Sequence, residues 1–388
     1  MSEIKLPIYL DHHATTPLDK RVLDEMMPYF TEKFGNASSL DHPFGYDASV
    51  AVEDAREKIA NAVGARHDEI IFTSGATESD NIALIGTMQK YADRGNHLIT
   101  CVTEHKAILD TAKHLESLGK KVTYLPVNKL GEIDLKELED SITDDTVMIS
   151  IMMANNEIGT IQDAKAIGEI AHKHDVIFHT DAAQAVGHIP VNVEEMSIDL
   201  MSFSAHKMYG PKGIGALYVR GVKPRVKPDG LFYGGGQERN IRSGTLNVPG
   251  IVGFGKAVEI SQKEMDSENK KFKEWSAMML GEFEKIGGVL NGHPTNRLSH
   301  NLNVYFPGIE GKSIINSVSK EIAISAGSAC TTQNVEPSHV LLALGQDEDT
   351  THYAIRIGIG RFNTIDEIKV AKNKICDSVN SIEKIRIK

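Results

Sequence analysis

Strand-like and helical patterns alternate along most of this 388-residue chain. Short apolar segments rich in Val, Ile, Phe and Thr are each followed by a helical pattern, the first two of which start near Thr77 and after His105. The apolar segments are residues 70–73, 97–100, 122–125, 147–153 and 176–180. This alternation is typical of βαβ units, which build a mostly parallel sheet with helices on both faces. We therefore expect an α/β fold with a large mixed sheet.

The alternation of strand-like and helical patterns changes after a long helical pattern over residues 248–286. Beyond Gly287 the strand and helix units become shorter, and a last helix is expected from Ile365. The strand-like segments here are residues 301–306, 322–324 and 353–357. Because a single core rarely grows past about 300 residues, a second unit is expected. We place a boundary near residue 260, with a smaller α+β domain after it.

The composition excludes several classes of protein. A net charge of −11 argues against nucleic acid or an anionic membrane as the main partner. No apolar stretch approaches the roughly 18 residues of a membrane span, and residues 1–7 have no signal-peptide core. The three cysteines are too few and too scattered for a disulfide framework or a zinc site. These features predict a cytoplasmic protein without a structural metal.

Two charged residues stand at the ends of predicted strands. Lys207 follows the apolar segment 198–203, and Gly210, Pro211 and Gly213 prevent a helix from continuing. Asp181 ends the apolar segment before it, and ligands of α/β sheets bind at such strand ends. Pyridoxal phosphate needs this pair, a lysine for the Schiff base and a carboxylate that keeps the pyridine nitrogen protonated. Taken alone, Lys207 would more simply be a solvated surface charge.

The segment 73–79 joins a strand to a helix through a glycine. Backbone N–H groups at Ala76 and Thr77, with the Thr77 hydroxyl, suit a phosphate dianion. Ser204 and His206, just before Lys207, could donate to the same phosphate. The alternative is an ordinary helix cap made by Ser74 or Thr77.

His105 and Arg356 each allow two interpretations. His105 lies just past a strand end, where it could stack on a cofactor ring and transfer protons, or simply cap the next helix. Cys101 and His105 alone do not make a metal site, because no second pair accompanies them. Arg356 alternates with isoleucines in a strand and needs an anion, either a substrate carboxylate or a structural carboxylate. For Arg361 the structural salt bridge is the preferred interpretation.

Cys330 lies in a segment of small and polar residues, 325–334. Such residues cannot pack a core, so an accessible loop is expected, and a cysteine there can act as a nucleophile if nearby charge lowers its pKa. An incidental surface thiol is the alternative. Cys376 stands at helical spacing from Val379 and is expected on the apolar face of the last helix.

Together these residues resemble the cysteine desulfurases, the NifS/IscS-like group of the class-V aminotransferases. The resemblance covers nearly the whole chain, and the matching stretches occur in the order of the family. They are residues 9–17, 72–81, 103–106, 155–159, 179–184, 242–245 and 325–330. The resemblance implies a pyridoxal-phosphate enzyme of fold-type I, with residues 16–260 as the large domain. Residues 1–15 and 261–388 would form the small domain, which carries the cysteine loop at about 325–336.

The resemblance also implies a role for each candidate residue. Lys207 would form the Schiff base, Asp181 would pair with the pyridinium, and His105 would stack on the ring and exchange protons with the substrate thiol. Arg356 would bind the substrate carboxylate. Gln184 and Asn156 would lie near the phenolic oxygen and the substrate. The phosphate would be held by Ala76, Thr77, Ser204 and His206, and, in a homodimer, by Thr245 reaching from the neighbouring subunit.

The implied reaction converts L-cysteine to L-alanine and leaves a persulfide on Cys330, which passes sulfur to an acceptor such as an iron–sulfur scaffold protein. With that scaffold, Cys330 could transiently ligate a cluster. The chain stops soon after its last helix, so the longer scaffold-binding tail of resembling enzymes is expected to be absent, and the acceptor stays open. The alternatives are a selenocysteine lyase, another fold-type I enzyme such as an aminotransferase, and a non-catalytic assembly subunit.

Overall fold

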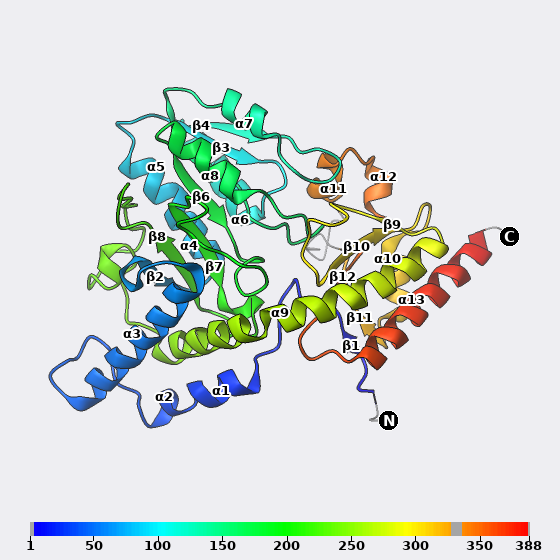
Figure 1. Cartoon of the computed structure of the whole chain (residues 1–388), viewed down its shortest axis with the longest axis horizontal. Coiled ribbons are helices and arrows are strands. Elements are labelled where there is room, and N and C mark those ends of the chain that lie inside the picture. Colours follow the sequence, from blue (N-terminus) through cyan, green and yellow to red (C-terminus); the bar gives the residue numbers. More distant parts are fainter. Residues whose placement is uncertain (1–3, 327–335, 387–388) are drawn as a thin grey trace.

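The computed structural model describes residues 4–326 and 336–386 of the chain. Within these residues the largest sheet has seven strands, in the order β2-β8-β7-β6-β5-β3-β4 (Figure 1). They are β2 (Ile70–Thr73), β8 (Gly215–Val219), β7 (Leu200–Ser204), β6 (Ile177–Asp181), β5 (Thr146–Ser150), β3 (His97–Cys101) and β4 (Lys121–Leu125). β8 runs antiparallel to both its neighbours, and the other adjacent pairs are parallel. The α/β prediction with a mostly parallel, mixed sheet is confirmed.

Helices cover both faces of this sheet. The helices of this part of the chain are α1 (Lys20–Met26), α2 (Pro28–Thr31), α3 (Pro43–Val63), α4 (Ala76–Asn81), α5 (Thr87–Lys90), α6 (Lys106–Ser117), α7 (Leu135–Asp140) and α8 (Ala164–Lys173). Successive side chains of a strand face opposite sides, so each strand supplies two layers of core. Leu98 and Met148 pack in the layer of α5 and α6, whereas Ile99 and Ile149 pack in the layer of α3 and α8.

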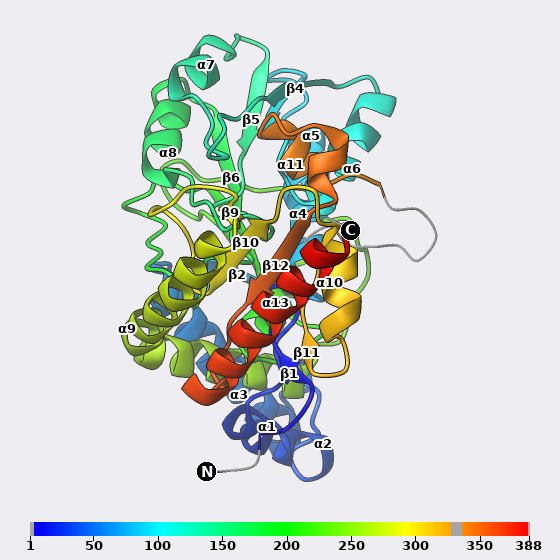
Figure 2. The same cartoon turned by 90° about the vertical axis from the view of Figure 1, so that its right-hand side faces the viewer.

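A smaller sheet lies beyond the large one. Its central strand β10 (Asn301–Tyr305) pairs antiparallel with β9 (Val289–Leu290) and β12 (Ala354–Gly358). Close by, β1 (Ile8–Tyr9) pairs parallel with β11 (Ile322–Ala323). The helices here are α10 (Gly311–Val318), α11 (His339–Ala343), α12 (Glu348–Thr351) and α13 (Ile365–Arg386), and α13 packs against α9 and α10 (Figure 2). The N-terminal strand therefore belongs to the core built mainly by residues after 270.

The long helix α9 (Val248–Lys285) runs from one core to the other (Figure 1). Its first half places Ile251 and Phe254 against the large sheet, and its second half places Trp275 and Phe283 in the small core. This change of core within one helix supports the proposed division into 16–260 and 1–15 plus 261–388. No helix among the described residues is long and apolar enough to cross a membrane.

Element types match the predictions closely, including the long helix and the closing helix. β5 is shorter than expected, because it ends at Ser150 rather than at residue 153. Residues 151–153 are buried like a strand, and the N–H groups of Ile151 and Met153 still bond carbonyls of β6. On the other side β3 has ended, and the N–H of Met152 bonds the Glu104 carboxylate at 2.6 Å. The apolar pattern reports burial, and it does not show where the hydrogen-bonding partner strand stops.

Candidate active site

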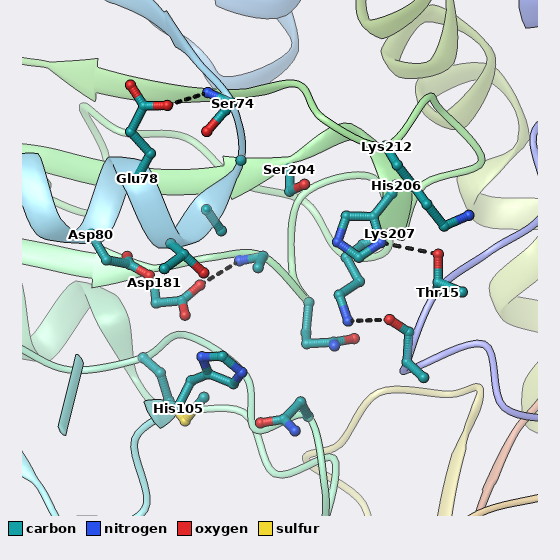
Figure 3. A pocket seen from close by; sticks show the side chains of 18 of the residues that line it. Thr15, Ser74, Glu78, Asp80, His105, Asp181, Ser204, His206, Lys207 and Lys212 are labelled. Atoms are coloured by element: carbon teal, nitrogen blue, oxygen red, sulfur yellow. Dashed lines mark hydrogen bonds between the residues drawn. The ribbon is translucent and has the colours of Figure 1, made fainter. Parts of the chain in front are cut away.

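A cavity of about 600 Å³ opens at the carboxyl ends of β6 and β7, beside the start of α4 (Figure 3). This is the edge of an α/β sheet at which ligands bind. The cavity is lined by most of the residues that the sequence predicted for the site, namely Ala76, Thr77, His105, Asn156, Asp181, Gln184, Ser204, His206 and Lys207. Tertiary folding therefore brings residues from many parts of the chain to one place.

Lys207 ends a single 3-10 turn, Ala205–Lys207, that follows β7 directly. The chain then bends sharply, and a Cβ at Gly210 would come within 2.8 Å of the Ala205 carbonyl oxygen. The Lys207 Nζ atom donates to the backbone carbonyls of His13 and of Ala14, the latter at 2.9 Å. Burial and the charge of Arg356 lower the pKa of Lys207 to about 8. A sizeable fraction of this amine is therefore neutral, and hence nucleophilic, near neutral pH.

Asp181 is the last residue of β6, and its carboxylate is buried at the far end of the cavity from Lys207 (Figure 3). Its Oδ1 atom accepts the Ala183 N–H at 2.9 Å, and among the described residues no cation pairs with it directly. Burial raises the pKa of Asp181, whereas His105, the Ala183 N–H and Lys207 oppose that rise. A buried carboxyl in this position favours a ligand that offers it a positively charged N–H group.

The start of α4 forms another wall of the cavity. The first N–H groups of a helix have no partner within the helix, and those of Ala76 and Thr77 lie at this wall. The Glu78 carboxylate is held by two hydrogen bonds, which it accepts from the Ser74 N–H at 2.7 Å and from the Arg242 Nε–H at 2.9 Å. Burial disfavours the Glu78 carboxylate, but these two bonds keep its pKa below the usual value. The negative charge beside the helix start is thus already paired.

Ser204 and His206 face the same wall from β7 and the turn after it (Figure 3). The His206 Nδ1 atom is 3.1 Å from the Thr15 hydroxyl. Burial and the neighbouring charge of Lys207 lower the pKa of His206 to about 4, so the ring is neutral at physiological pH. Both side chains can therefore donate hydrogen bonds to an anion held at the start of α4.

The structure confirms the capping interpretation of His105, and stacking on a cofactor ring with proton transfer stays a prediction. His105 caps α6, because its Nδ1 atom accepts the Ala107 N–H at 3.1 Å, and it also lines the cavity. Since Nδ1 accepts, the proton of a neutral ring lies on Nε2. Asn156 reaches the cavity from a turn that Asn155 holds by accepting the Glu157 and Ile158 N–H groups. The capping bond thus fixes the tautomer of a ring that is exposed to the cavity.

Arg356, in β12, pairs with Asp11 at 2.9 Å and donates to the Asn156 carbonyl at 3.1 Å. The structural carboxylate of the alternative interpretation is therefore present, and binding of a substrate carboxylate stays a prediction. Arg361 forms a buried network with Glu268 at 2.6 Å and Asp19 at 3.1 Å, so its structural interpretation is confirmed.

Thr245, Cys101 and Cys376 do not line the cavity. Thr245 is exposed and does not line it, and Cys330 falls outside the described residues. Cys101 is buried against Thr103, and burial raises the pKa of its thiol to about 12. Cys376 lies half-buried in α13, against the small core. In residues 4–326 and 336–386, no group of three His, Cys, Asp or Glu side chains could hold a metal ion.

The N-terminal segment is the part of the site that sequence reasoning missed. Ala14 and Thr15 line the cavity, and the main chain of residues 13–14 accepts both bonds from Lys207. His13 also holds Gln184, whose Nε2 donates to the His13 carbonyl at 3.1 Å. The histidine pair at 12–13 was visible in the sequence, but no local pattern connected it with residues 184 and 207.

Comparison with known proteins identifies the family. The Aminotransferase class-V family matches residues 8–370. The cysteine desulfurase IscS of Rickettsia massiliae (strain Mtu5) is 50% identical over 387 residues, which are 99% of this chain and 94% of that relative. The protein of the same description from Rickettsia bellii (strain OSU 85-389) is 51% identical over 384 residues, 98% of this chain and 93% of that relative. This chain belongs to the class-V aminotransferases, in their cysteine desulfurase group.

Solved structures agree with this assignment. A NifS-like protein matches this member of the cysteine desulfurase group with a TM-score of 0.90 at 39% identity, covering 97% of this chain and 100% of the other. A structure of SspA in complex with cysteine matches with a TM-score of 0.80 at 38% identity, covering 92% and 100%. The architecture is that of fold-type I, as the sequence predicted.

Proposed function

We propose that this protein releases sulfur from L-cysteine, with pyridoxal phosphate as its cofactor and Cys330 as the first sulfur acceptor. The observation that carries the proposal is the cavity itself, in which the Lys207 amine and the Asp181 carboxyl lie at opposite ends of the space next to the start of α4. Membership of the cysteine desulfurases supports the choice of substrate.

The residues that line the cavity match the three polar ends of pyridoxal phosphate. Ala76, Thr77, Ser204 and His206 would hold the phosphate, and Asp181 would accept the pyridinium N–H. Gln184 would donate to the phenolic oxygen, and His105 would stack on the ring. When bound, the cofactor would supply an electron sink for the carbon next to the substrate amine. Asp181 would keep the ring nitrogen protonated, which strengthens this electron sink.

The protein's own groups bind cysteine and move its protons. Arg356 would exchange Asp11 for the substrate carboxylate, and Asn156 would bind nearby. Lys207, with a pKa lowered to about 8, is suited to take the α-proton of the substrate. His105 would exchange a proton with the substrate thiol. In sum, L-cysteine and the Cys330 thiol give L-alanine and a Cys330 persulfide, so the sulfur moves and the Cys330 proton ends on alanine.

A homodimer is part of this proposal. Apolar side chains that are 39–64% exposed gather within residues 23–50, the segment that includes α1 and α2 (Figure 1): Leu23, Met27, Phe30, Phe34, Leu40, Phe44, Tyr46 and Val50. Monomers rarely expose such a surface, which favours an interface between subunits. Thr245, exposed and away from its own cavity, would then reach the phosphate of the neighbouring subunit.

We further propose that the persulfide passes to an iron–sulfur scaffold protein or another sulfur acceptor in the cytoplasm. The low cysteine content and the dependence on a free Cys330 thiol both suit a reducing compartment.

The test is an assay of alanine from cysteine in the presence of a reducing agent, with mass spectrometry of the protein after cysteine treatment. We expect one added sulfur on Cys330. Alanine formation should fall at least about hundredfold in Lys207→Ala and Cys330→Ser, because each loses a covalent step, whereas Cys376→Ser keeps the parental rate.

Three outcomes would contradict the proposal. An added sulfur on Cys101 or Cys376 would refute the role of Cys330. A parent that holds the cofactor but makes no alanine would favour the non-catalytic assembly subunit. A strong preference for selenocysteine over cysteine would indicate a selenocysteine lyase.

A further inference from the structure

Three buried histidine rings form a stack behind the cavity. His300, just before β10, lies between His13 of the N-terminal segment and His188, which follows β6. The ring centroids of His13 and His300 are 4.5 Å apart with an interplanar angle of 21°, and those of His188 and His300 are 4.3 Å apart with 27°. The three rings come from distant parts of the sequence, so the stack exists only in the folded chain.

The two outer rings contact residues of the site. The His13 Nδ1 atom is 3.1 Å from Gln184 Oε1, and the Gln184 Nε2 atom returns a bond to the His13 carbonyl. The His188 Nε2 atom is 2.9 Å from the Lys207 carbonyl oxygen, to which it can donate. The stack therefore supports Gln184 at one end and the Lys207 main chain at the other.

The middle ring makes its contacts by packing. Among the described residues the His300 Nδ1 atom has no hydrogen-bond partner, and the Phe272 ring lies 5.9 Å away on another side. Burial lowers the pKa of His300 well below the usual value, and the two neighbouring histidines add to this effect. Burial likewise lowers the pKa of His13 and of His188. Three neutral rings attract one another by dispersion. A charge on His13 would repel Lys207 and Arg356, and a charge on His188 would repel Lys207.

We propose that His300 is a positioning residue, which holds Gln184 through His13 and the Lys207 main chain through His188. Because His300 immediately precedes β10 of the small sheet, it links that part of the molecule to the two cofactor-contacting residues. The inference rests on the proposed function, since Gln184 and Lys207 matter here as cofactor ligands. A ring that merely filled space would affect stability without affecting the cofactor.

The experiment measures how fast the holoenzyme releases pyridoxal phosphate to an excess of a cofactor-binding trap. Removing the middle ring in His300→Ala should speed release at least about tenfold and change the circular dichroism of the bound cofactor. His300→Phe keeps a neutral ring in the stack and should stay within about threefold of the parent. For cysteine turnover, His300→Ala should lower kcat with little change in KM, because the substrate carboxylate site is untouched.

A matched control separates positioning from lost stability. Phe283→Ala removes a buried ring from the same small core but has no contact with the stack, so it should lower Tm yet release the cofactor at the parental rate. Equal release rates in His300→Ala and Phe283→Ala would overturn the proposal. If His300→Ala fails to fold, His13→Phe takes its place, since it keeps the stack but loses the bond to Gln184. Parental release in His13→Phe would also overturn the proposal.

A double-mutant cycle tests the route through Gln184. In a Gln184→Ala background, His300→Ala should speed release by less than about threefold, because the side chain that it positions is already gone. The same increase in both backgrounds would contradict the proposal. A parent that binds the cofactor without converting cysteine would refute the proposed function, and the release rates would still decide the role of His300.

Discussion

At the scale of single residues, burial lowers the pKa of Lys207 and so makes its amine more nucleophilic at neutral pH. Its amine is desolvated, lies near the charge of Arg356 and bonds two backbone carbonyls of the N-terminal segment. Burial and Arg356 disfavour the charged form, and Asp181 and Asp11 favour it. The net result is a pKa of about 8, well below the usual value for lysine, so neutral amine is present without a separate base.

This pKa predicts how the apoprotein captures pyridoxal phosphate. Only the neutral amine attacks the aldehyde, so capture should speed up as pH rises and level off above about pH 8. Between about pH 7 and about pH 9 the neutral fraction grows about tenfold for a pKa near 8, but about a hundredfold for an unshifted lysine. Stopped-flow absorbance across this range measures the rate. A hundredfold rise with no plateau would show that Lys207 is not perturbed.

At the scale of elements, α9 is the helix that the two cores share, and its glycines set how closely it packs. At Gly255 a Cβ would lie 2.8 Å from the Ala55 Cα atom of α3, so α3 and α9 approach closely there. At Gly281, further along the same helix, a Cβ would meet nothing within 4 Å. The two positions share a helical backbone and differ in the space around them.

This contrast predicts opposite effects of one substitution. Gly255→Ala should lower the free energy of unfolding by about 1–3 kcal/mol, because α3 and α9 must move apart. Gly281→Ala should raise it by about 0.4–1 kcal/mol, because alanine restricts the unfolded chain and favours the helix. Urea denaturation of the two variants measures both changes. Stabilisation by Gly255→Ala would contradict the close approach of the two helices.

At the scale of the whole molecule, we expect a second copy of the chain to complete the proposed active site. Thr245 is exposed and does not line the cavity of its own chain, and an apolar surface lies within residues 23–50. If each site takes Lys207 from one subunit and Thr245 from the other, two defective chains can rebuild one intact site between them.

Mixing the variants tests this arrangement. Lys207→Ala alone should be inactive, and Thr245→Ala should lose cofactor, because a donor to the phosphate dianion is missing. Subunits exchanged between the two variants should recover up to about a quarter of parental activity at limiting cofactor, since half of the dimers carry one intact site. Sedimentation measures the dimer. Activity that stays at the level of the separate variants, or a monomer with full cofactor occupancy, would contradict a shared site.

The sequence by itself determined the elements and the chemistry at their ends. The periodicity of apolar residues predicted the strands, the long helix α9 and the closing helix, because the period reflects which side chains are buried. The same local information placed Asp181 at the end of β6 and Lys207 in the turn that follows β7.

Only the tertiary structure decided how distant segments meet. Three sets of contacts join residues that are more than 100 positions apart in the sequence. They are the bonds from Lys207 to residues 13 and 14, the ion pair of Arg356 with Asp11, and the stack around His300. Local periodicity carries no signal for such contacts. The antiparallel β8 and the early end of β5 follow from pairing with other strands, which a strand's own residues do not specify. These contacts depend on the packing of the two cores, so they appear only once the whole chain has folded.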